Sequence, residues 1–316
     1  MILKVAVVGI GGIGPVHLTN WKQVPQARVC CACDIRPERQ DCLEDKTLPF
    51  YTDLETMLQK EKPDIVDICT PSYLHFTHAM TAMEHGAHVL LEKPVCMDES
   101  QIDRLYAAAQ KHRVKFMVAH VVRFWYEYLC LKQMIDARTY GRVLSAHFTR
   151  LGEVPRWSYQ NWMMDEKRSG LVPFDLHIHD LDFLVYTFGE PTAVESRRGR
   201  GDMQDYLSVC YTYPDFFVTC EAGWFNGSYP FQSRFRVQFE DALVESADGQ
   251  VQIYTPDGQV KTLAETAKSE TGLNLPTSNA YANELCYFAA CVENDRQPER
   301  VRREELHTVL QILKRL

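Results

Sequence analysis

A glycine-rich turn near the start of the chain constrains the fold more than any other feature. The letters GIGGIG, residues 9–14, follow the apolar run 3–8 and lead into a segment that can begin a helix. Gly9 permits a tight turn, Gly11 lets the backbone approach a pyrophosphate, and Gly14 lets helix and strand pack closely. A strand, a glycine turn and a helix in this order predict a dinucleotide-binding βαβ unit.

An acidic residue stands where such a unit needs one. A second apolar run, 27–33, ends in Asp34, twenty residues beyond Gly14, the spacing expected for an acid that binds the ribose hydroxyls. A carboxylate accepts hydrogen bonds from a free 2′-hydroxyl and repels a 2′-phosphate, so NAD is favoured. Arg36 could instead pair with a 2′-phosphate, which keeps NADP as the alternative, or it could be a solvated loop arginine.

The composition excludes several classes of protein. The 316 residues are 46% hydrophobic and 24% charged, and no stretch approaches the roughly 20 apolar residues of a membrane span. A net charge of −8 disfavours nucleic acid and anionic membranes as partners. The first strand begins at once after Met1, leaving no room for a signal peptide, so we expect a cytoplasmic protein with reduced cysteines.

The first part of the chain alternates short apolar runs with amphipathic segments, which is typical of a parallel sheet covered by helices. Strands are expected at residues 3–8, 28–33, 64–69, 88–91 and 115–118. Helices are expected at 53–60, 75–85 and 98–112, with Asp53 and Asp98 as N-caps. This pattern predicts a doubly wound Rossmann domain over residues 1–122, with its ligand edge at the strand C-termini.

The pattern then changes to an α+β domain over residues 123–316. Helices are expected at 126–137, from about 175, at 279–294 and at 303–316, and strands at 142–151, 192–198, 205–213, 216–225, 233–240, 242–247 and 250–254. These strands predict a large, mostly antiparallel open sheet. Its outer face is expected to be apolar and to bury itself in a homodimer or homotetramer. The cluster Arg197-Arg198-Gly199-Arg200 is expected in a solvated turn.

A lysine at a predicted strand end can carry acid–base chemistry. Glu92-Lys93-Pro94 directly follows the strand 88–91 and so falls at the ligand edge. Lys93 can act as acid or base, Pro94 cannot continue the sheet, and Glu92 could orient the ammonium or bind a cofactor ribose.

A second cluster holds Asp175 and His179, which share a face if the segment is helical. Asp182 would follow one turn later, and His177 would point away from them. A carboxylate and an imidazole on one face can bind hydroxyls and transfer a proton. The alternatives are chelation of zinc or iron, and a capping aspartate with a packed core histidine.

Together these motifs resemble the Gfo/Idh/MocA family, the glucose–fructose oxidoreductase and inositol dehydrogenase group. The resemblance rests on the glycine turn, Asp34, Cys69-Thr70-Pro71 with His75, Glu92-Lys93-Pro94, and Asp175 with His179. It implies a Rossmann domain followed by a domain with a large open sheet, commonly buried in dimers or tetramers. It also implies oxidation or reduction of a carbon of a sugar, cyclitol or related polyol with NAD(P).

The resemblance also implies roles for individual residues. Lys93, Asp175 and His179 would be catalytic and would contact the substrate together with Arg123 and Trp162. The cofactor would be bound by Gly9, Gly11, Gly12, Ile13, Gly14, Asp34, Ile35, Arg36, Thr70, Pro71, His75, Glu92 and Lys93. No metal is expected.

Two departures from the family bear on the substrate. Ser169-Gly170-Leu171 replaces the usual glycine triplet, and His177 stands where a small residue is common, so we expect a pocket of altered shape. Trp157, Tyr159 and Trp162 could form an aromatic platform for a sugar, or could be ordinary packing residues.

Three functional classes follow from the sequence. In the first, Lys93 or His179 removes a hydroxyl proton while a hydride leaves the same carbon. In the second, a redox-assisted glycosidase or lyase oxidises its substrate transiently and recycles NAD. In the third, the protein is a non-enzymatic cofactor-binding sensor.

Overall fold

The computed structural model describes residues 2–247, 249–265 and 279–316, and these pack into two units. Unit 1 holds the chain up to His120 together with Trp157–Ser169 and Tyr281–His307. Unit 2 holds Val121–Arg156, Gly170–Ala280 and Thr308–Leu316. Each unit is described by itself, and the domain ranges 1–122 and 123–316 stay predictions.

Unit 1 is built on a six-stranded parallel sheet in the order β3-β2-β1-β4-β5-β6, the order of a Rossmann fold. The strands are β1 (Leu3–Val8), β2 (Ala27–Cys33), β3 (Phe50–Tyr51), β4 (Ile65–Ile68), β5 (His88–Glu92) and β6 (Phe116–Ala119). The five expected strands lie within one residue of their predicted ends. The sequence did not predict β3, because two residues are too short to show a periodicity.

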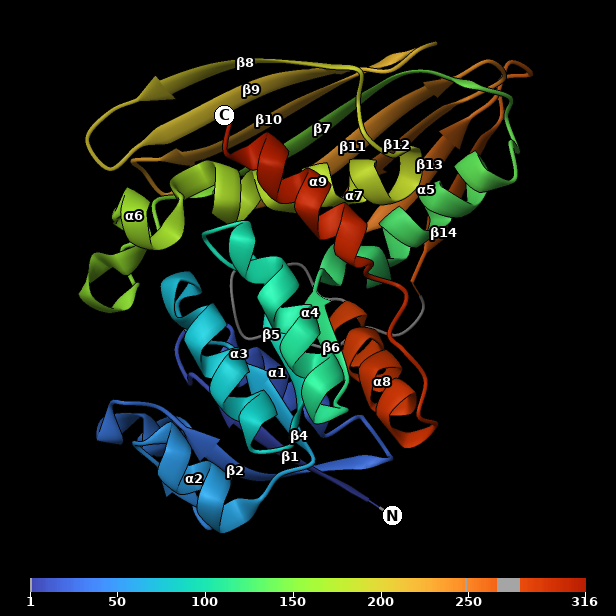
Figure 1. The fold of residues 1–316 in the computed structure, drawn as a ribbon. Helices are drawn as coiled ribbons and strands as arrows, with labels where there is room; N and C mark the ends of the chain where they lie inside the picture. The colour runs from blue at the N-terminus through green and yellow to red at the C-terminus, as the bar shows by residue number, and fades with distance from the viewer. Residues whose placement is uncertain (1, 248, 266–278) are drawn as a thin grey trace. The chain divides into compact units, whose positions relative to one another are not determined.

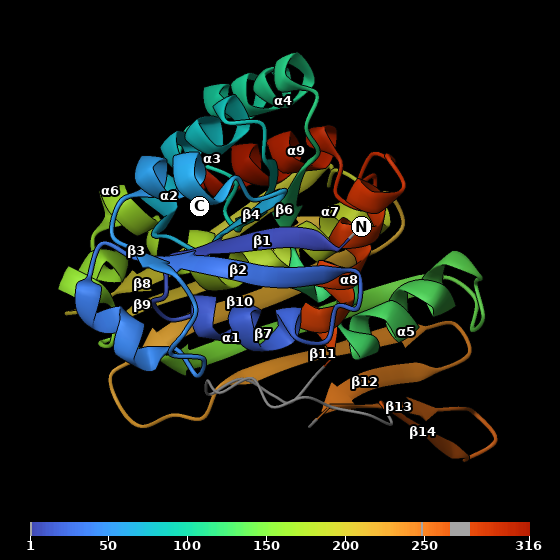
Figure 2. The same ribbon diagram turned by 90° about the horizontal axis from the view of Figure 1, so that it is seen from below.

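Helices cover both faces of this sheet. The helices of unit 1 are α1 (Gly14–Trp21), α2 (Leu54–Glu61), α3 (His75–Glu84), α4 (Ser100–His112), the short α6 (Glu166–Ser169) and α8 (Ala280–Glu293), of which α6 does not lie over the sheet. Figure 2 shows α2, α3 and α4 together on one face and α1 on the other. There α8 lies beside α1, because the Tyr281 ring meets the edge of His17 with centroids 5.8 Å apart.

The two predicted helix caps differ in the structure. Asp53 caps α2 by accepting a hydrogen bond from the Thr56 amide at 2.8 Å, as predicted. Asp98 is not the N-cap of α4, because the cap falls on Glu99 one residue later. The Asp98 carboxylate still accepts a hydrogen bond from the amide of Ser100 at 3.1 Å.

Unit 2 is built on an eight-stranded sheet in the order β14-β13-β12-β11-β7-β10-β9-β8. Its strands are β7 (Val143–Glu153), β8 (Ala193–Arg200), β9 (Asp205–Thr212), β10 (Phe217–Phe225), β11 (Gln232–Phe239), β12 (Leu243–Ala247), β13 (Gln250–Tyr254) and β14 (Val260–Ala264). Among the described strands of this sheet, only β7 and β10 pair in parallel, and the other neighbours are antiparallel. The sequence missed β14, an exposed edge strand with little alternation.

The basic cluster at residues 197–200 lies inside β8, so its prediction as a turn was wrong. The reason is an ion pair across the strand: Arg198 donates two hydrogen bonds to Asp205 of β9, at 2.8 and 2.7 Å. That pairing holds the cluster in the ladder at the sheet edge, where Arg197 and Arg200 are exposed.

Two helices, α5 (Tyr126–Asp136) and α7 (Ile178–Phe188), lie against one face of this sheet (Figure 1). Phe148, Phe183 and Phe235 surround Tyr128 between the layers, with the Phe183 ring 4.9 Å away. The final helix, α9 (Arg303–Leu313), begins in unit 1 and ends in unit 2. Among the described residues, no helix has both the length and the apolar character needed to cross a bilayer.

The opposite face of the sheet is polar at its centre, which corrects the prediction of an apolar outer face. His147 contacts Thr219 at 2.8 Å, and Glu221 accepts hydrogen bonds from Thr149 and Tyr206, both at 3.0 Å. These side chains alternate with buried ones on β7 and β10, so the polar ladder replaces the apolar surface that the argument for self-association had assumed. Assembly through this sheet stays a prediction.

A buried ion pair ties the sheet of unit 2 to α7. Arg150 of β7 donates to both oxygens of Asp180, at 3.0 and 2.8 Å, and both side chains are fully buried. We expect Arg150→Ala to lower the free energy of unfolding by about 3–5 kcal/mol, because it leaves the Asp180 charge buried and unpaired. Urea denaturation followed by circular dichroism measures the loss.

Arg142→Ala is the matched control, since Arg142 directly precedes β7 and forms an exposed pair with Glu240, the residue after β11. Water screens that pair, so stability should change little. Equal losses in the two variants would contradict the importance of the buried pair.

Candidate active site

The glycine turn after β1 has the shape that a nucleotide phosphate needs. Gly9 has a φ of +92°, and a Cβ there would lie 2.7 Å from the carbonyl of Cys69. A Cβ on Gly14 would lie 2.0 Å from the carbonyl oxygen of Gly9, so α1 can begin this close to β1 only without a side chain. At Gly11 the nearest atom to a Cβ would be the Arg36 guanidinium, 3.6 Å away. The backbone is thus accessible where the pyrophosphate of a dinucleotide would lie.

Asp34, at the end of β2, is held in place by three groups. Its carboxylate accepts hydrogen bonds from the Ile10 amide at 2.8 Å, from the Arg36 amide at 3.0 Å, and from the Arg36 guanidinium at 2.9 and 3.0 Å. The guanidinium also lies over the ring of Tyr159, 4.6 Å from its centroid. The hydrogen bond to Asp34 raises the pKa of Arg36. Arg36 is therefore a fixed cation beside the acid, whereas Ile35 between them is exposed.

At the end of β4, Thr70 and Pro71 lead into a 3₁₀ turn, Ser72–Leu74. The buried ring of His75 follows, with its two nitrogens facing the carbonyl oxygens of Pro94 at 2.7 Å and Thr70 at 2.8 Å. Burial lowers the pKa of His75 despite these two contacts. The imidazole thus lies between the turn after β4 and the turn after β5, and its single N–H can donate to one of these two carbonyl oxygens.

The turn after β5 carries Lys93, which is half-buried and precedes a cis peptide bond to Pro94. The neighbouring Glu92 faces inward: one carboxylate oxygen accepts the Lys93 amide at 3.0 Å and the other contacts His17 at 3.1 Å. Both oxygens of Glu92 are thus engaged within unit 1, so its first role is to support this turn.

The sequence prediction missed the group beneath that turn. His17 of α1 contacts Asp67 at 2.8 Å through Nδ1 and Glu92 through Nε2, and Trp21 donates its indole N–H to Asp67 at 2.7 Å. Asp67 is a lone charge inside the apolar strand β4, and that was the available signal. A charge in such a run needs a buried partner.

The charges in this cluster shift the titration of its members. Burial, the largest single effect, would lower the pKa of His17, but the interactions with Asp67 and Cys69 together raise that pKa well above its ordinary value. Burial would raise the pKa of Glu92, but the hydrogen bond and charge of His17 lower it. Burial, reinforced by the Glu92 charge, raises the pKa of Glu284 well above its ordinary value. The cluster is therefore an imidazolium between two carboxylates, beside a neutral Glu284.

His17, Asp67 and Cys69 also lie close enough together to be compared with a metal site. Their arrangement is that of a hydrogen-bond network, because the His17 and Trp21 donors point at the same Asp67 oxygen. A cation at that oxygen would have to displace both donors. The expectation of no metal stays a prediction.

In unit 2, Asp175 and His179 lie where a π-helix, Pro173–His177, passes into α7. The sequence had predicted a regular helix here. The wider π turn is a form that often occurs at functional sites. Asp175 and His179 are both partly exposed while Leu176 and Ile178 between them are buried, so the two polar groups share the accessible side of this segment.

His177 does not border this accessible side, which corrects the expectation that it alters the pocket. Its ring is buried against β9, stacked on Tyr211 and hydrogen-bonded to the Tyr211 hydroxyl at 2.5 Å. Burial lowers the pKa of His177 to about 4, so the ring is neutral.

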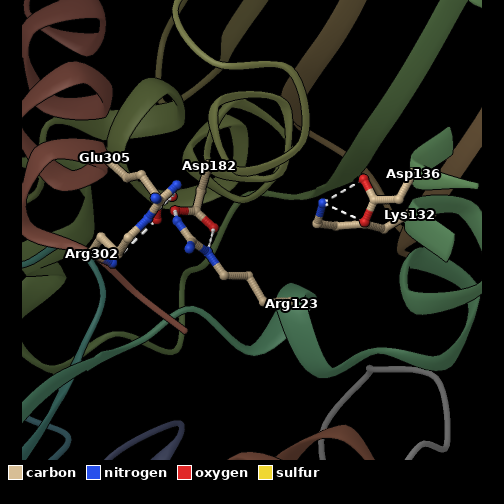
Figure 3. A network of polar contacts seen from close by, with 6 residues as sticks. All are labelled: Arg123, Lys132, Asp136, Asp182, Arg302 and Glu305. Carbon is tan, nitrogen blue, oxygen red and sulfur yellow. Dashed lines mark hydrogen bonds and ion pairs between the residues drawn. The ribbon is translucent and has the colours of Figure 1, made fainter. Parts of the chain in front are cut away.

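Asp182 and Arg123 form a second buried ion pair that holds α7 (Figure 3). The guanidinium donates to both carboxylate oxygens, at 2.8 and 2.6 Å, and lies over the ring of Tyr186. Asp182 was expected on the face of Asp175 and His179 but is fully buried. By contrast, Lys132 and Asp136 in the same view form a surface pair within α5. The guanidinium of Arg123 is therefore ion-paired with Asp182 of α7.

The aromatic loop is divided between two environments. Trp157 is 65% exposed, and its ring covers Gly12, where a Cβ would lie 2.6 Å from the indole. Tyr159 stacks on Arg36, whereas Trp162 is partly buried in a short helical segment, Tyr159–Met164. Two of the three aromatic residues thus pack on the nucleotide side of unit 1, beside Gly12 and Arg36.

Comparison with known proteins gives matches to two family models. The model described as "Oxidoreductase family, NAD-binding Rossmann fold" matches residues 3–120, and "GFO/IDH/MocA C-terminal domain" matches residues 128–245. A structure of an Agrobacterium radiobacter oxidoreductase in complex with NAD⁺, L-tartaric acid and magnesium superposes with a TM-score of 0.83. It covers 99% of this chain and 95% of that one at 15% identity, a likeness of fold alone.

Two curated relatives have different activities in their names. The 2,7-anhydro-N-acetylneuraminate hydratase of Mediterraneibacter gnavus is 30% identical over 66% of this chain, and the match spans 58% of the relative's own length. The D-glucoside 3-dehydrogenase of Escherichia coli is 25% identical over 90% of this chain and 88% of its own.

The ion pair of His17 and Glu92 makes stability depend on pH. The raised pKa of His17 gives a contribution that is complete below its ordinary value of 6.5 and lost as pH rises through the folded-state pKa. The lowered pKa of Glu92 gives a contribution complete above 4.5 and lost as pH falls. We expect His17→Gln to cost about 3 kcal/mol between these values and less at alkaline pH.

Urea denaturation at about pH 5.5, 7.5 and 9.5 measures this dependence. Trp21→Phe is the control, because it removes a neutral donor to Asp67 and should cost the same at each pH. A constant gap between the wild type and His17→Gln would contradict a charged His17.

Proposed function

Because the chain belongs to the Gfo/Idh/MocA family of oxidoreductases, we propose that it transfers a hydride between a nicotinamide cofactor and a hydroxyl-bearing carbon of a sugar, glycoside or cyclitol. The observation that carries the proposal is the arrangement of unit 1. The open glycine turn, the anchored Asp34 and the turn bearing Lys93 all follow parallel strands of one sheet, at their carboxyl ends. Ligands bind at this edge in doubly wound folds.

The cofactor residues divide by the part of the dinucleotide that they suit. Gly9, Gly11, Gly12, Ile13 and Gly14 offer backbone to the pyrophosphate, and Asp34, Ile35 and Arg36 lie where the adenosine ribose would bind. Thr70, Pro71 and His75 form the turn after β4, and Glu92 and Lys93 the turn after β5. A bound nicotinamide would supply the hydride acceptor. We propose NAD as the cofactor, because Asp34 offers oxygens to a free 2′-hydroxyl.

Lys93 and His179 provide the acid–base chemistry, and Asp175 orients the imidazole of His179 or a substrate hydroxyl. One of the two basic groups takes the hydroxyl proton as the hydride leaves, because an alkoxide is too basic to accumulate at neutral pH. The indole ring of Trp162 packs against one face of the sugar. Arg123 acts through its ion pair with Asp182, holding the helix that carries His179. The proposal requires Lys93 of unit 1 to meet Asp175 and His179 of unit 2 during turnover.

A second candidate is a redox-assisted lyase or glycosidase. The similarity to a protein named a hydratase favours it, since an elimination needs the same proton-transfer groups. Transient oxidation of a carbon acidifies the neighbouring C–H, a substituent then leaves, and the hydride returns, so no NADH accumulates. A non-enzymatic sensor, the third class, would have no use for Lys93, Asp175 and His179.

We also propose that the protein is cytoplasmic and forms a homodimer or homotetramer. Light scattering measures the molar mass of the assembly and so tests the oligomeric state.

An absorbance screen separates these classes. Purified protein is mixed with NAD or NADP and with sugars, inositols and glycosides, in both redox directions. Accumulation of NADH with a free sugar indicates a dehydrogenase, and product release without net NADH indicates the lyase. We expect Lys93→Met to lower kcat by about 10²–10⁴-fold, the usual contribution of a positioned acid or base, while NAD binding stays within a few fold.

Lys46→Met is the matched control, because Lys46 is an exposed lysine of the same unit. It should leave kcat and the Kd for NAD unchanged. Full activity of Lys93→Met would end the proposed role of the lysine, and failure of the wild type to bind either nucleotide would end the proposed function.

Cofactor choice is tested at Asp34. We expect Asp34→Ala to weaken NAD about tenfold, because a charge-assisted hydrogen bond to the ribose is lost. NADP should bind as well as before or better, since the repelling carboxylate is gone and Arg36 stays. Calorimetric Kd values for both nucleotides measure the ratio. Equal weakening of NAD and NADP would contradict the proposal that Asp34 selects between them.

A further inference from the structure

We propose that His17 is a positioning residue for Lys93: from α1 it binds the Glu92 carboxylate and thereby fixes the turn that carries the lysine. The inference rests on the proposed function in one respect, that Lys93 is the group whose placement matters. It concerns a residue to which neither the sequence motifs nor the family resemblance gave a role.

The contacts form one continuous path through buried atoms. Asp67 binds Nδ1 of His17, Nε2 of His17 binds one oxygen of Glu92, and the other oxygen accepts the amide of Lys93. His17 and Asp67 are completely buried, and Glu92 is 7% exposed. Because a bridged carboxylate cannot rotate without breaking one of its bonds, the backbone at Lys93 is held to α1.

The surroundings of His17 favour a charged imidazole, since carboxylates face it from two strands. Asp67 and the Cys69 thiol approach from β4 and the residue after it, Glu92 from β5, and Glu284 with the Tyr281 ring from α8. From α1 itself, Trp21 binds Asp67 and so orients that carboxylate toward the ring. The Lys93 ammonium adds a positive charge that also lowers the pKa of Glu92.

A purely structural role would not need such a cluster. Buried ion pairs are expensive to desolvate, and apolar residues of similar volume often give equal or greater stability. The cluster lies between two parts of the candidate site, the glycine turn and Lys93. Helix α1, which carries His17, begins at the glycine turn, and Glu92 directly precedes Lys93 in the chain. The path therefore links the nucleotide loop to the lysine. His75 holds the other side of the same turn through the Pro94 carbonyl.

The link has a chemical consequence at the amine. A charged His17 offsets part of the negative charge of Asp67 and Glu92, so the lysine faces less net negative charge than it would beside a neutral residue at this position. Replacing His17 by glutamine keeps a donor for Glu92 but removes the positive charge. Glu92 then attracts the Lys93 ammonium more strongly, which makes the amine less available as a nucleophile or base at a given pH.

Competitive acetylation tests this without a substrate. The wild type, His17→Gln and Trp21→Phe are labelled with trace acetic anhydride at neutral pH, and peptide mass spectrometry gives the reactivity of Lys93 relative to the exposed Lys46. We expect His17→Gln to lower this ratio at least threefold. Trp21→Phe perturbs the same network at Asp67 rather than at Glu92, so it should keep the ratio within twofold.

A kinetic readout follows once a substrate is known. The pH profile of kcat/KM should move to higher pH in His17→Gln but not in Trp21→Phe, with the calorimetric Kd for NAD within threefold of the wild type. An unchanged or raised labelling ratio in His17→Gln, or an equal fall in Trp21→Phe, overturns the inference. Activity retained by Lys93→Met overturns the proposed function instead, and the labelling ratio still decides whether His17 controls the lysine.

Discussion

The close approach of α1 to β1 at the glycine turn is the constraint on which unit 1 depends. Because Gly14 has no side chain, the helix begins against the carbonyl of Gly9. That contact sets the depth of α1 against the sheet, and one turn further on it delivers His17 to Asp67 on β4 and Glu92 on β5. The same glycines that leave backbone free for a phosphate thus also place a buried cation beneath the lysine turn. Nucleotide binding and lysine placement share one packing contact.

In unit 2, a π turn and two buried ion pairs position the candidate catalytic groups. The segment carrying Asp175 and His179 keeps both groups partly exposed, and it forms a π turn at the start of α7. The helix is then fixed by two fully buried arginine–carboxylate pairs, Arg150 with Asp180 and Arg123 with Asp182. Such pairs give orientation at a cost in desolvation. They hold the accessible imidazole on a rigid support.

The sequence predicted the sheet of unit 1 closely because its strands are buried on both faces and appear as continuous apolar runs between helical periods. The same logic failed for the outer face of unit 2. A strand such as β7 alternates, and the sequence shows that one side is polar but not that His147 and Thr149 meet Thr219 and Glu221 across the ladder. The cluster at residues 197–200 failed for a related reason, since Asp205 supplies the partner that keeps Arg198 in a strand.

For the candidate site, too, the sequence predicted some features and the tertiary structure decided others. By itself the sequence determined that a glycine turn, an acid at Asp34 and a lysine at Lys93 would each follow a strand, because those signals are local in the chain. Only the tertiary structure decided which distant groups hold the buried charges of the site: His17 for Glu92, the Ile10 amide for Asp34, and Arg123 for Asp182. The physical reason is that a buried charge must find its partner in space. That partner comes from an element whose distance along the chain carries no signal.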